Sequence, residues 1–274
     1  MKFTRIAVAA VASAAALGLA ACGGGSGGGS GSGSGSTVKV GIKFDQPGLG
    51  LKEGSNYSGF DVDVANFVAK ELGVTPQFVE AVSSQRETLI STGQVKYIVG
   101  TYSITDKRKK DVSFAGPYFI AGQDLLVRAD DSSITGPDSL AGKKLCSVKG
   151  STSAANLQKK VPGVNLQEYN TYSLCVDALK AKNVDALTTD DTILAGYAAQ
   201  PQNQGKLKVV GQKFSTENYG VGLKKGDQEF CNKVTAALQK FIDSGEWEKS
   251  VKKYLGPANY QPGPGNPPKP TCQL

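Results

Sequence analysis

The sequence predicts an α/β protein of two lobes joined by a two-stranded hinge. Short apolar strands alternate with amphipathic helices over 38–101 and again over 144–188. A β-α-β order of this kind favours a parallel sheet with right-handed crossovers in each unit. Two extended segments, 122–127 and 218–223, lie on either side of the second unit, so the chain leaves the first lobe and later returns to it. Two such crossings form a hinge about which lobes can close.

The first unit begins with an alternating strand at 38–44 and continues into a helix. Asp61 is expected to cap that helix, and Gly73 to end it in a left-handed conformation. One face of the helix is apolar at helical spacing, with Val64, Ala65, Val68 and Leu72. Two more strands and a helix between them complete the unit, at 76–82, 97–101 and 85–91 respectively.

The second unit repeats this alternation. Its strands are expected at 144–148, 165–168 and 185–188, and its helices at 152–160 and 174–182. A longer amphipathic helix at 228–244 ends before Gly245, and a short helix continues to Tyr254. Because the chain crosses twice, we assign 37–123 and 221–256 to lobe 1 and 124–220 to lobe 2. The C-terminal segment 257–274 is too rich in proline for regular structure.

The N-terminal residues have the features of an export signal. A basic start is followed by an alanine-rich apolar run that is too short to cross a bilayer as a helix. Leu-Ala-Ala-Cys at 19–22 has the pattern of a bacterial lipobox, so we expect a signal peptide over 1–21 that is removed before a diacylated Cys22. Residues 22–36 form a glycine and serine linker, for which an artificial linker is the alternative. These features predict an exported protein, lipid-anchored to the outer face of the cytoplasmic membrane.

Composition excludes several kinds of chemistry. The chain has no histidine, which excludes Ser-His-Asp and Cys-His catalysis and histidine metal sites. The cysteines are dispersed and no GxxxxGK[ST] phosphate loop occurs, so we expect neither a metal site nor a cofactor. The excess of 31 Lys and Arg over 24 Asp and Glu is modest. Together with export, it favours a membrane-side location or acidic small molecules over nucleic acid.

The odd number of five cysteines is accounted for if Cys22 carries the lipid and the other four form two disulfides. Pairing Cys146 with Cys175 and Cys231 with Cys272 is one of three possibilities. It is the only one that keeps the first bond inside one lobe. The second bond would then fix the C-terminal segment to the folded domain.

Eight segments occur in an order that carries a family resemblance: VGIKFDQPGLGL (40–51), GFDVDVA (59–65), SSQRETL (83–89), GTYSITDKRK (100–109), VSFAGPYF (112–119), CSVKGST (146–152), VDALTTDD (184–191) and YGVGLKK (219–225). Over 38–256 the chain resembles the family 3 extracellular solute-binding proteins of polar amino-acid ABC importers, and among them the glutamate-binding lipoproteins. The resemblance implies two Rossmann-like lobes in the type II arrangement of periplasmic binding proteins, with an amino acid buried between them. It also implies a monomer that delivers its ligand to the transmembrane permease subunits.

An amino-acid zwitterion buried between two lobes needs partners for both of its charges, because an unpaired buried ion is costly. Arg108 aligns with the arginine that the family uses for the α-carboxylate, and a guanidinium grips a carboxylate with two parallel hydrogen bonds. Asp190 follows an apolar strand and is expected to pair with the α-ammonium. Thr101 and Ser103 by resemblance, and Thr152 and Ser153 at the start of a helix, are expected to hydrogen-bond the backbone groups of the ligand.

Lys43 and Arg86 stand where relatives that bind acidic ligands place cations against the distal carboxylate. Two cations beyond Arg108 would be neutralised by glutamate but not by glutamine, so we expect an acidic amino acid. Tyr172 stands where some of these relatives carry histidine, and a phenol donates a hydrogen bond without charge. The alternatives are a receptor for glutamine, asparagine or aspartate, or, in another class, a dehydratase-type enzyme or sensor that shares the fold. Because the site has no histidine, we expect little pH dependence of binding from about pH 5 to 9.

Overall fold

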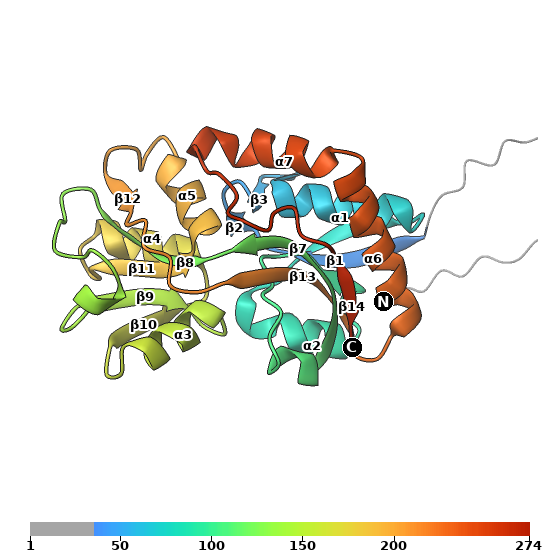
Figure 1. Ribbon diagram of the computed structural model, residues 1–274, viewed down its shortest axis with the longest axis horizontal. Coiled ribbons are helices and arrows are strands. Elements are labelled where there is room, and N and C mark those ends of the chain that lie inside the picture. Colours follow the sequence, from blue (N-terminus) through green and yellow to red (C-terminus); the bar gives the residue numbers. More distant parts are fainter. Residues whose placement is uncertain (1–35) are drawn as a thin grey trace, which may run out of the picture. The chain divides into compact units, whose positions relative to one another are not determined.

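The computed structural model describes residues 36–274, so the expected signal peptide, Cys22 and nearly all of the linker lie outside the described residues. The described chain forms two large sheets with helices packed on them, and a small third sheet (Figure 1). Two lobes are therefore present, each built around its own sheet. Within residues 36–274, no helix has the length and apolar character needed to cross a membrane.

The first sheet has six strands, in the order β14 (Thr271–Gln273), β7 (Val112–Ala121), β13 (Glu217–Lys224), β6 (Tyr97–Ile98), β1 (Thr37–Ile42) and β5 (Thr75–Glu80). Its helices are α1 (Phe60–Glu71), α2 (Arg86–Ser91), α6 (Gln228–Asp243) and α7 (Glu246–Tyr254). Neighbouring side chains of β6 point to opposite faces of the sheet. Tyr97 donates to the Ala65 carbonyl of α1, whereas Ile98 packs in a separate cluster with Ile90 of α2. Helices therefore cover both faces.

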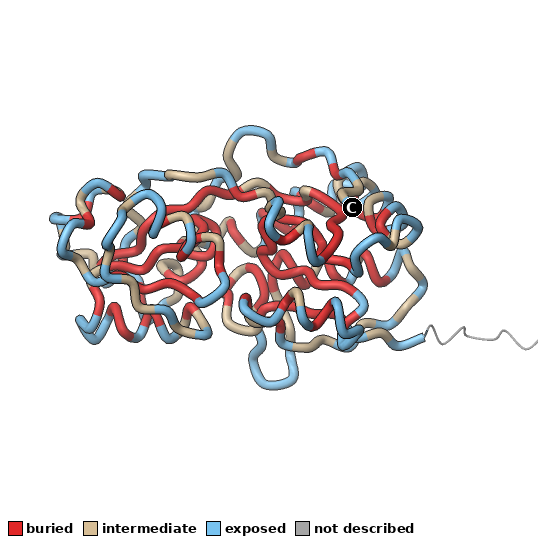
Figure 2. The backbone as a smooth tube through the Cα atoms, turned by 90° about the horizontal axis from the view of Figure 1, so that it is seen from below, coloured by how far each residue is buried: buried red, intermediate tan, exposed pale blue. Residues whose placement is uncertain are grey.

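The second sheet has five strands, in the order β10 (Asn165–Tyr169), β9 (Lys144–Val148), β11 (Ala186–Asp190), β8 (Gln123–Arg128) and β12 (Leu207–Val209). Its helices are α3 (Thr152–Lys160), α4 (Tyr172–Lys180) and α5 (Asp191–Ala199). The third sheet is β2 (Asp45–Gln46), β3 (Gly50–Glu53) and β4 (Asn56–Ser58), and four 3-10 turns complete the described part, η1 (Ser83–Gln85), η2 (Arg108–Lys110), η3 (Pro137–Ser139) and η4 (Gly256–Ala258). Buried backbone follows both large sheets (Figure 2).

Both large sheets are mixed, so the expectation of parallel sheets was only partly correct. The pairs β1–β5, β1–β6, β9–β10 and β9–β11 are parallel, while β7, β13, β14, β8 and β12 pair antiparallel. The β-α-β units supply the parallel strands. Among the antiparallel strands, β7, β8 and β13 carry the chain to the second lobe and back, whereas β12 and β14 are edge strands of the two sheets.

The two crossings between the lobes lie side by side, which makes a two-stranded hinge. Only Gly122 separates β7 from β8, and the returning segment runs next to it before β13. The Phe214 amide donates to the Gln123 carbonyl over 2.9 Å, and the Gln123 amide donates to Ser215 Oγ over 3.1 Å. The two chain segments that the sequence analysis expected to be extended are indeed strands.

Asp61 does not cap α1, which corrects a prediction. The N-cap is Gly59, at a φ of 127° that favours glycine, and a Cβ there would come within 2.1 Å of the Leu49 carbonyl oxygen. Asp61 instead lies in the first turn, fully buried, with its carboxylate turned to other partners. At the other end Gly73 is left-handed as predicted, with a φ of 66°.

Most of the C-terminal segment lacks regular structure, as its proline content predicts, but it contacts the first lobe and ends in a strand that the prediction missed. Asn266 donates to the Ile120 carbonyl through its side chain and accepts the Ile120 amide, at 2.8 and 2.9 Å. Beyond it, β14 pairs with β7, with Cys272 opposite Ala115. Composition over 257–274 hides this strand because only three residues form it.

Two disulfides are present, and they have the pairing that the sequence analysis favoured. Cys146 of β9 is bonded to Cys175 of α4, and Cys231 of α6 to Cys272 of β14. The second bond joins the C-terminal segment to the helices of the first lobe.

Candidate functional site

The nine residues predicted to bind a ligand come from both lobes, and the fold brings them together between the two large sheets. Lys43, Arg86, Thr101, Ser103 and Arg108 belong to the first lobe, and Thr152, Ser153, Tyr172 and Asp190 to the second. Eight of them are buried and Thr152 is half-buried. Buried polar side chains in such number need partners, so the groups that lack one indicate where a ligand would bind.

Arg108 connects the two lobes. Its Nη1 donates to the Ser103 carbonyl over 2.8 Å and its Nη2 to the Gly150 carbonyl of the second lobe over 3.0 Å. Its Nε lies 3.4 Å from a carboxylate oxygen of Glu87. Burial lowers the pKa of Arg108 to about 10, so it stays charged at neutral pH. Because a guanidinium has five N–H donors, Nη1 and Nη2 each keep one for a carboxylate.

Gly150 is a point of close contact between the second lobe and the first. Its φ is 78°, and a Cβ there would lie 2.8 Å from the Cα atom of Ser84. Only glycine accepts both the conformation and the distance. Ser103 Oγ and Thr152 Oγ1 are also within 3.4 Å across the lobes. The lobes are thus in contact at the site.

The Thr152 hydroxyl is engaged by residues that the sequence analysis missed. It donates to Glu217 Oε2 over 2.9 Å and accepts from Gln123 Nε2 over 3.1 Å. A hydroxyl has one hydrogen, so Thr152 can offer a ligand carboxylate only its backbone N–H while this bond stands. The first turn of α3 leaves such N–H groups without acceptors inside the helix. Neither Gln123 nor Glu217 lies in a recognisable motif, because both belong to the hinge crossings.

Asp190 ends β11, and within residues 36–274 one of its carboxylate oxygens is free to bind a positively charged group. Its Oδ2 accepts the hydroxyl of Tyr219 over 2.7 Å, while its Oδ1 is buried with no hydrogen-bond partner among the described residues. Burial, and then the charge of Glu217, raises the pKa of Asp190 well above its usual value. An ammonium group placed at Oδ1 would supply the missing donor and the missing counter-charge.

Lys43 and Arg86 are buried next to one another in the first lobe. Lys43 Nζ donates to Ser83 Oγ over 3.1 Å, and Arg86 Nη1 donates to the Gly100 carbonyl over 3.0 Å. The Arg86 guanidinium lies over the Tyr102 ring, 4.1 Å from its centroid, and Arg108 lies 5.0 Å from the same centroid. Arg86 Nε is buried without a partner among the described residues. Lys43, Arg86 and Arg108 therefore lie near one another, and in the described part of the chain the two arginines keep N–H groups that are free to bind a ligand.

The expectation of pH-independent charges needs correction at Lys43. Burial, and then the positive charge of Arg86, lowers the pKa of Lys43 to about 8, which lies inside the range in which its charge was expected to be constant. Tyr172 is different, because burial raises the pKa of its phenol and keeps it protonated. The Tyr172 backbone N–H donates to Asp45 Oδ2 over 2.8 Å, a further bond between the lobes.

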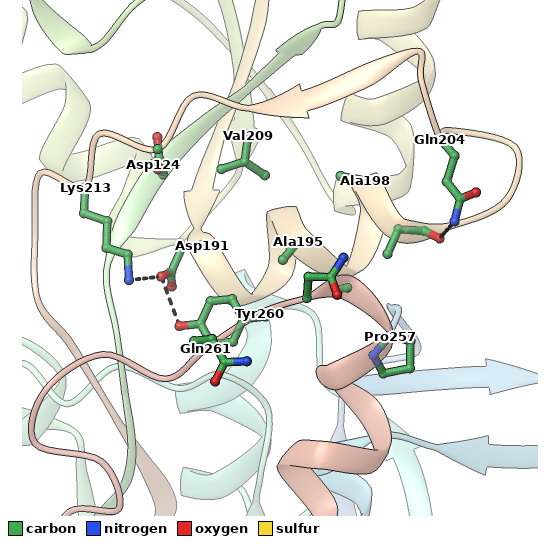
Figure 3. A pocket seen from close by; sticks show the side chains of 14 residues that line it. Asp124, Asp191, Ala195, Ala198, Gln204, Val209, Lys213, Pro257, Tyr260 and Gln261 are labelled. Carbon is green, nitrogen blue, oxygen red and sulfur yellow. Dashed lines mark hydrogen bonds and ion pairs between the residues drawn. The ribbon is translucent and has the colours of Figure 1, made fainter.

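A surface cavity of about 570 Å³ lies away from these nine residues, between α5, β12 and the segment after α7 (Figure 3). Asp191 lines it and accepts the Tyr260 hydroxyl over 3.0 Å and Lys213 Nζ over 2.5 Å. Asp191 and Lys213 of this cavity are therefore already paired with each other. Within residues 36–274 there is no cluster of three or more potential metal ligands.

Two α/β lobes on a double hinge, with a buried polar site between them, define a two-lobed binding protein. Residues 38–257 match the family of bacterial extracellular solute-binding proteins, family 3, and the chain belongs to that family. The C-terminal segment from 258 onward lies beyond the matched region. The family resemblance and the fold class inferred from the sequence are both confirmed.

Individual relatives differ in their ligands. The glutamate-binding protein GluB of Corynebacterium glutamicum is 47% identical over 234 residues, covering 80% of this chain and 79% of the relative. The ABC transporter glutamine-binding protein GlnH of Bacillus subtilis is 37% identical over 221 residues, covering 78% and 80%. Among solved structures, an ancestral arginine-binding protein bound to glutamine has a TM-score of 0.76 at 34% identity, covering 80% of this chain and 98% of the other.

Proposed function

We propose that this chain is the substrate-binding component of an ABC amino-acid importer and that its ligand is L-glutamate. The observation that carries the proposal is the burial of three cations, Lys43, Arg86 and Arg108, around a site whose Asp190 retains an unpartnered carboxylate oxygen. Glutamate brings two carboxylates and one ammonium, which matches this distribution of charge. Glutamine lacks the second carboxylate and would leave buried positive charge uncompensated.

In the proposed complex each lobe recognises different groups of the ligand. Arg108 holds the α-carboxylate together with the backbone N–H groups at the start of α3, near Thr152 and Ser153. Asp190 pairs with the α-ammonium, and Thr101 and Ser103 hydrogen-bond the backbone groups of the ligand. Lys43 and Arg86 neutralise the side-chain carboxylate, and Tyr172 donates a hydrogen bond from the second lobe.

The proposal extends to the organisation of the chain. Lobe 1 comprises 37–123 and 221–256, to whose sheet the C-terminal segment adds β14, and lobe 2 comprises 124–220, with hinge crossings at the boundaries. The protein is exported as its family implies, and we propose that Cys22 anchors it to the membrane by lipid. It acts as a monomer that binds its ligand by lobe closure and passes it to the permease, without catalysing a reaction.

Calorimetric titration of the purified protein with glutamate, aspartate, glutamine and asparagine tests the ligand. We expect glutamate to bind at least about 100-fold more tightly than glutamine, because the second carboxylate neutralises buried cations. Equal affinity for the two, or tighter binding of glutamine, contradicts the proposal and favours a glutamine receptor such as the relative from Bacillus subtilis. Conversion of an added amino acid into a new product would contradict the absence of catalysis.

A further inference from the structure

Asp61 is a fully buried carboxylate that the proposed function leaves without a role. It lies in the first turn of α1, where the helix dipole favours a negative charge. No lysine or arginine among the described residues lies within ion-pair distance of it. Burial raises its pKa to about 6, because the low-dielectric surroundings make the ionised form of the carboxyl group less favourable. The hydrogen bonds that this carboxylate accepts indicate why a buried acidic residue stands here.

Asp61 stabilises the turn at Thr101 by hydrogen bonding. Its Oδ2 accepts the Thr101 amide over 2.9 Å and its Oδ1 accepts the Tyr118 hydroxyl over 2.8 Å. Thr101 has a φ of 45°, a left-handed conformation that is unfavourable for a non-glycine residue. The Thr101 hydroxyl donates a second hydrogen bond, to Gln46 Oε1 over 3.2 Å. The bonds to Asp61 and Gln46 thus stabilise a backbone conformation that Thr101 would not adopt alone.

The same turn orients Arg86. Arg86 Nη1 donates to the Gly100 carbonyl over 3.0 Å and lies 3.5 Å from the Thr101 carbonyl. The guanidinium is therefore held between these carbonyls on one side and the Tyr102 ring on the other. If the turn relaxed, Arg86 would lose its main hydrogen-bond acceptors and with them its fixed direction.

We propose that Asp61 is a positioning residue for Arg86 and thereby sets the preference of the site for an anionic over a neutral ligand side chain. The inference rests on the proposed function, because it assigns Arg86 to the distal carboxylate. Two effects of Asp61 oppose each other. Its negative charge weakens the attraction of a second anion, whereas its hydrogen bond fixes the guanidinium that binds that anion. The proposal is that fixing the guanidinium outweighs the repulsion.

Two substitutions separate these effects. Asp61→Ala removes both the charge and the hydrogen bond to Thr101, whereas Asp61→Asn removes the charge and keeps an acceptor for the Thr101 amide. Asp63→Ala is the matched control, since Asp63 lies in the same helical turn but accepts Ser250 of α7 instead, over 2.8 Å. Each variant is titrated with glutamate and with glutamine in the calorimeter, and its unfolding is followed in parallel.

We expect Asp61→Ala to weaken the binding of both ligands, because Thr101 also contacts their backbone groups, and to weaken glutamate binding at least about tenfold more than glutamine binding. Asp61→Asn should bind glutamate within about threefold of the wild type or more tightly, and Asp63→Ala should change neither affinity. A ratio of the two dissociation constants that stays at the wild-type value in Asp61→Ala overturns the inference, as does an Asn variant that behaves like the Ala variant. If Asp61→Ala does not fold, Gln46→Ala, which removes the second hydrogen bond of Thr101, must shift the ratio in the same direction.

Failure of the proposed function appears separately, in the wild type. A wild-type protein that prefers glutamine contradicts the glutamate assignment. The role of Asp61 is then still decided by whether Asp61→Ala shifts the ratio of dissociation constants further toward glutamine.

Discussion

The two halves of the candidate site differ in the sign of their charged groups. The first lobe supplies the three cations, and each of them donates to a side chain or carbonyl of the protein. The second lobe supplies Asp190, with one oxygen unpartnered, and the start of α3. Each half also retains a buried group without a partner among the described residues, Arg86 Nε in the first and Asp190 Oδ1 in the second, so a ligand completes both halves, but with opposite charges. This difference suggests that lobe 1 sets side-chain preference and that lobe 2 responds to the zwitterion by closing.

The largest effect is expected at Arg108, which donates hydrogen bonds to carbonyl groups of both lobes. Arg108→Ala should weaken binding of every amino acid by about 1000-fold, because it leaves the α-carboxylate unpaired. Arg128→Ala is a suitable control, since Arg128 bonds carbonyls of the second lobe at Leu179 and Val184, away from the site. Calorimetry that finds micromolar binding preserved in Arg108→Ala would mean that the site has been placed wrongly.

Closure depends on the close approach at Gly150. Gly150→Ala should weaken binding at least about tenfold, because a Cβ would meet Ser84 and the left-handed φ would be strained. Gly142→Ala is matched to it, with a φ of 74° but nothing within 4 Å. Both variants should lose similar stability on thermal unfolding. Equal ligand affinities in the two variants would show that the lobes do not need this contact.

The cationic half predicts a pH dependence in the alkaline range. Lys43 has a pKa of about 8 in the ligand-free protein, and binding of an anion favours its protonated form. Affinity for glutamate should therefore be nearly constant up to about pH 7, be about twofold weaker at pH 8, where half of Lys43 is neutral, and fall above pH 8 by up to about tenfold per pH unit. Lys43→Arg, which stays charged, should remove this fall when both proteins are titrated from pH 7 to 9. A wild-type affinity that does not change up to pH 9 would argue against contact between Lys43 and the ligand.

The smallest effect on binding is expected at the second disulfide, which lies outside both halves. The double variant Cys231→Ser, Cys272→Ser should lower the free energy of unfolding by about 4 kcal/mol through loss of loop closure. Glutamate affinity should stay within about twofold, because this bond touches no site residue. Denaturant unfolding and calorimetry measure the two quantities. A large loss of affinity would show that the C-terminal segment controls the hinge.

Local sequence patterns predicted those elements whose conformation depends on residues that are close in the sequence. The alternation of strands and helices, the hinge crossings and the left-handed Gly73 all depend on neighbouring residues, and all are present. The mixed sheets could not be predicted in this way, because β13 and β14 pair with β7 across about 100 residues or more. Asp61 was misread for a similar reason, since its partners Thr101 and Tyr118 are distant in sequence.

The candidate site shows the same division. Arg108 and Asp190 could be singled out because the family resemblance aligns them with ligand-binding positions and their charges suit a zwitterion. Glu217 and Gln123 were missed because their role arises only where the hinge crossings meet α3. The lowered pKa of Lys43 likewise depends on burial and on Arg86, which the fold brings beside it. Sequence therefore indicated the candidate ligand-binding groups, but not the groups that position them.

The central claim, that buried cations of lobe 1 select an acidic side chain, is tested most directly at Arg86. Glutamate and glutamine are titrated into the wild type and into Arg86→Met, which removes the charge but keeps an unbranched side chain. The account predicts that the wild type prefers glutamate by at least about 100-fold and that the variant loses at least about tenfold of this preference. The same preference in both proteins would contradict it.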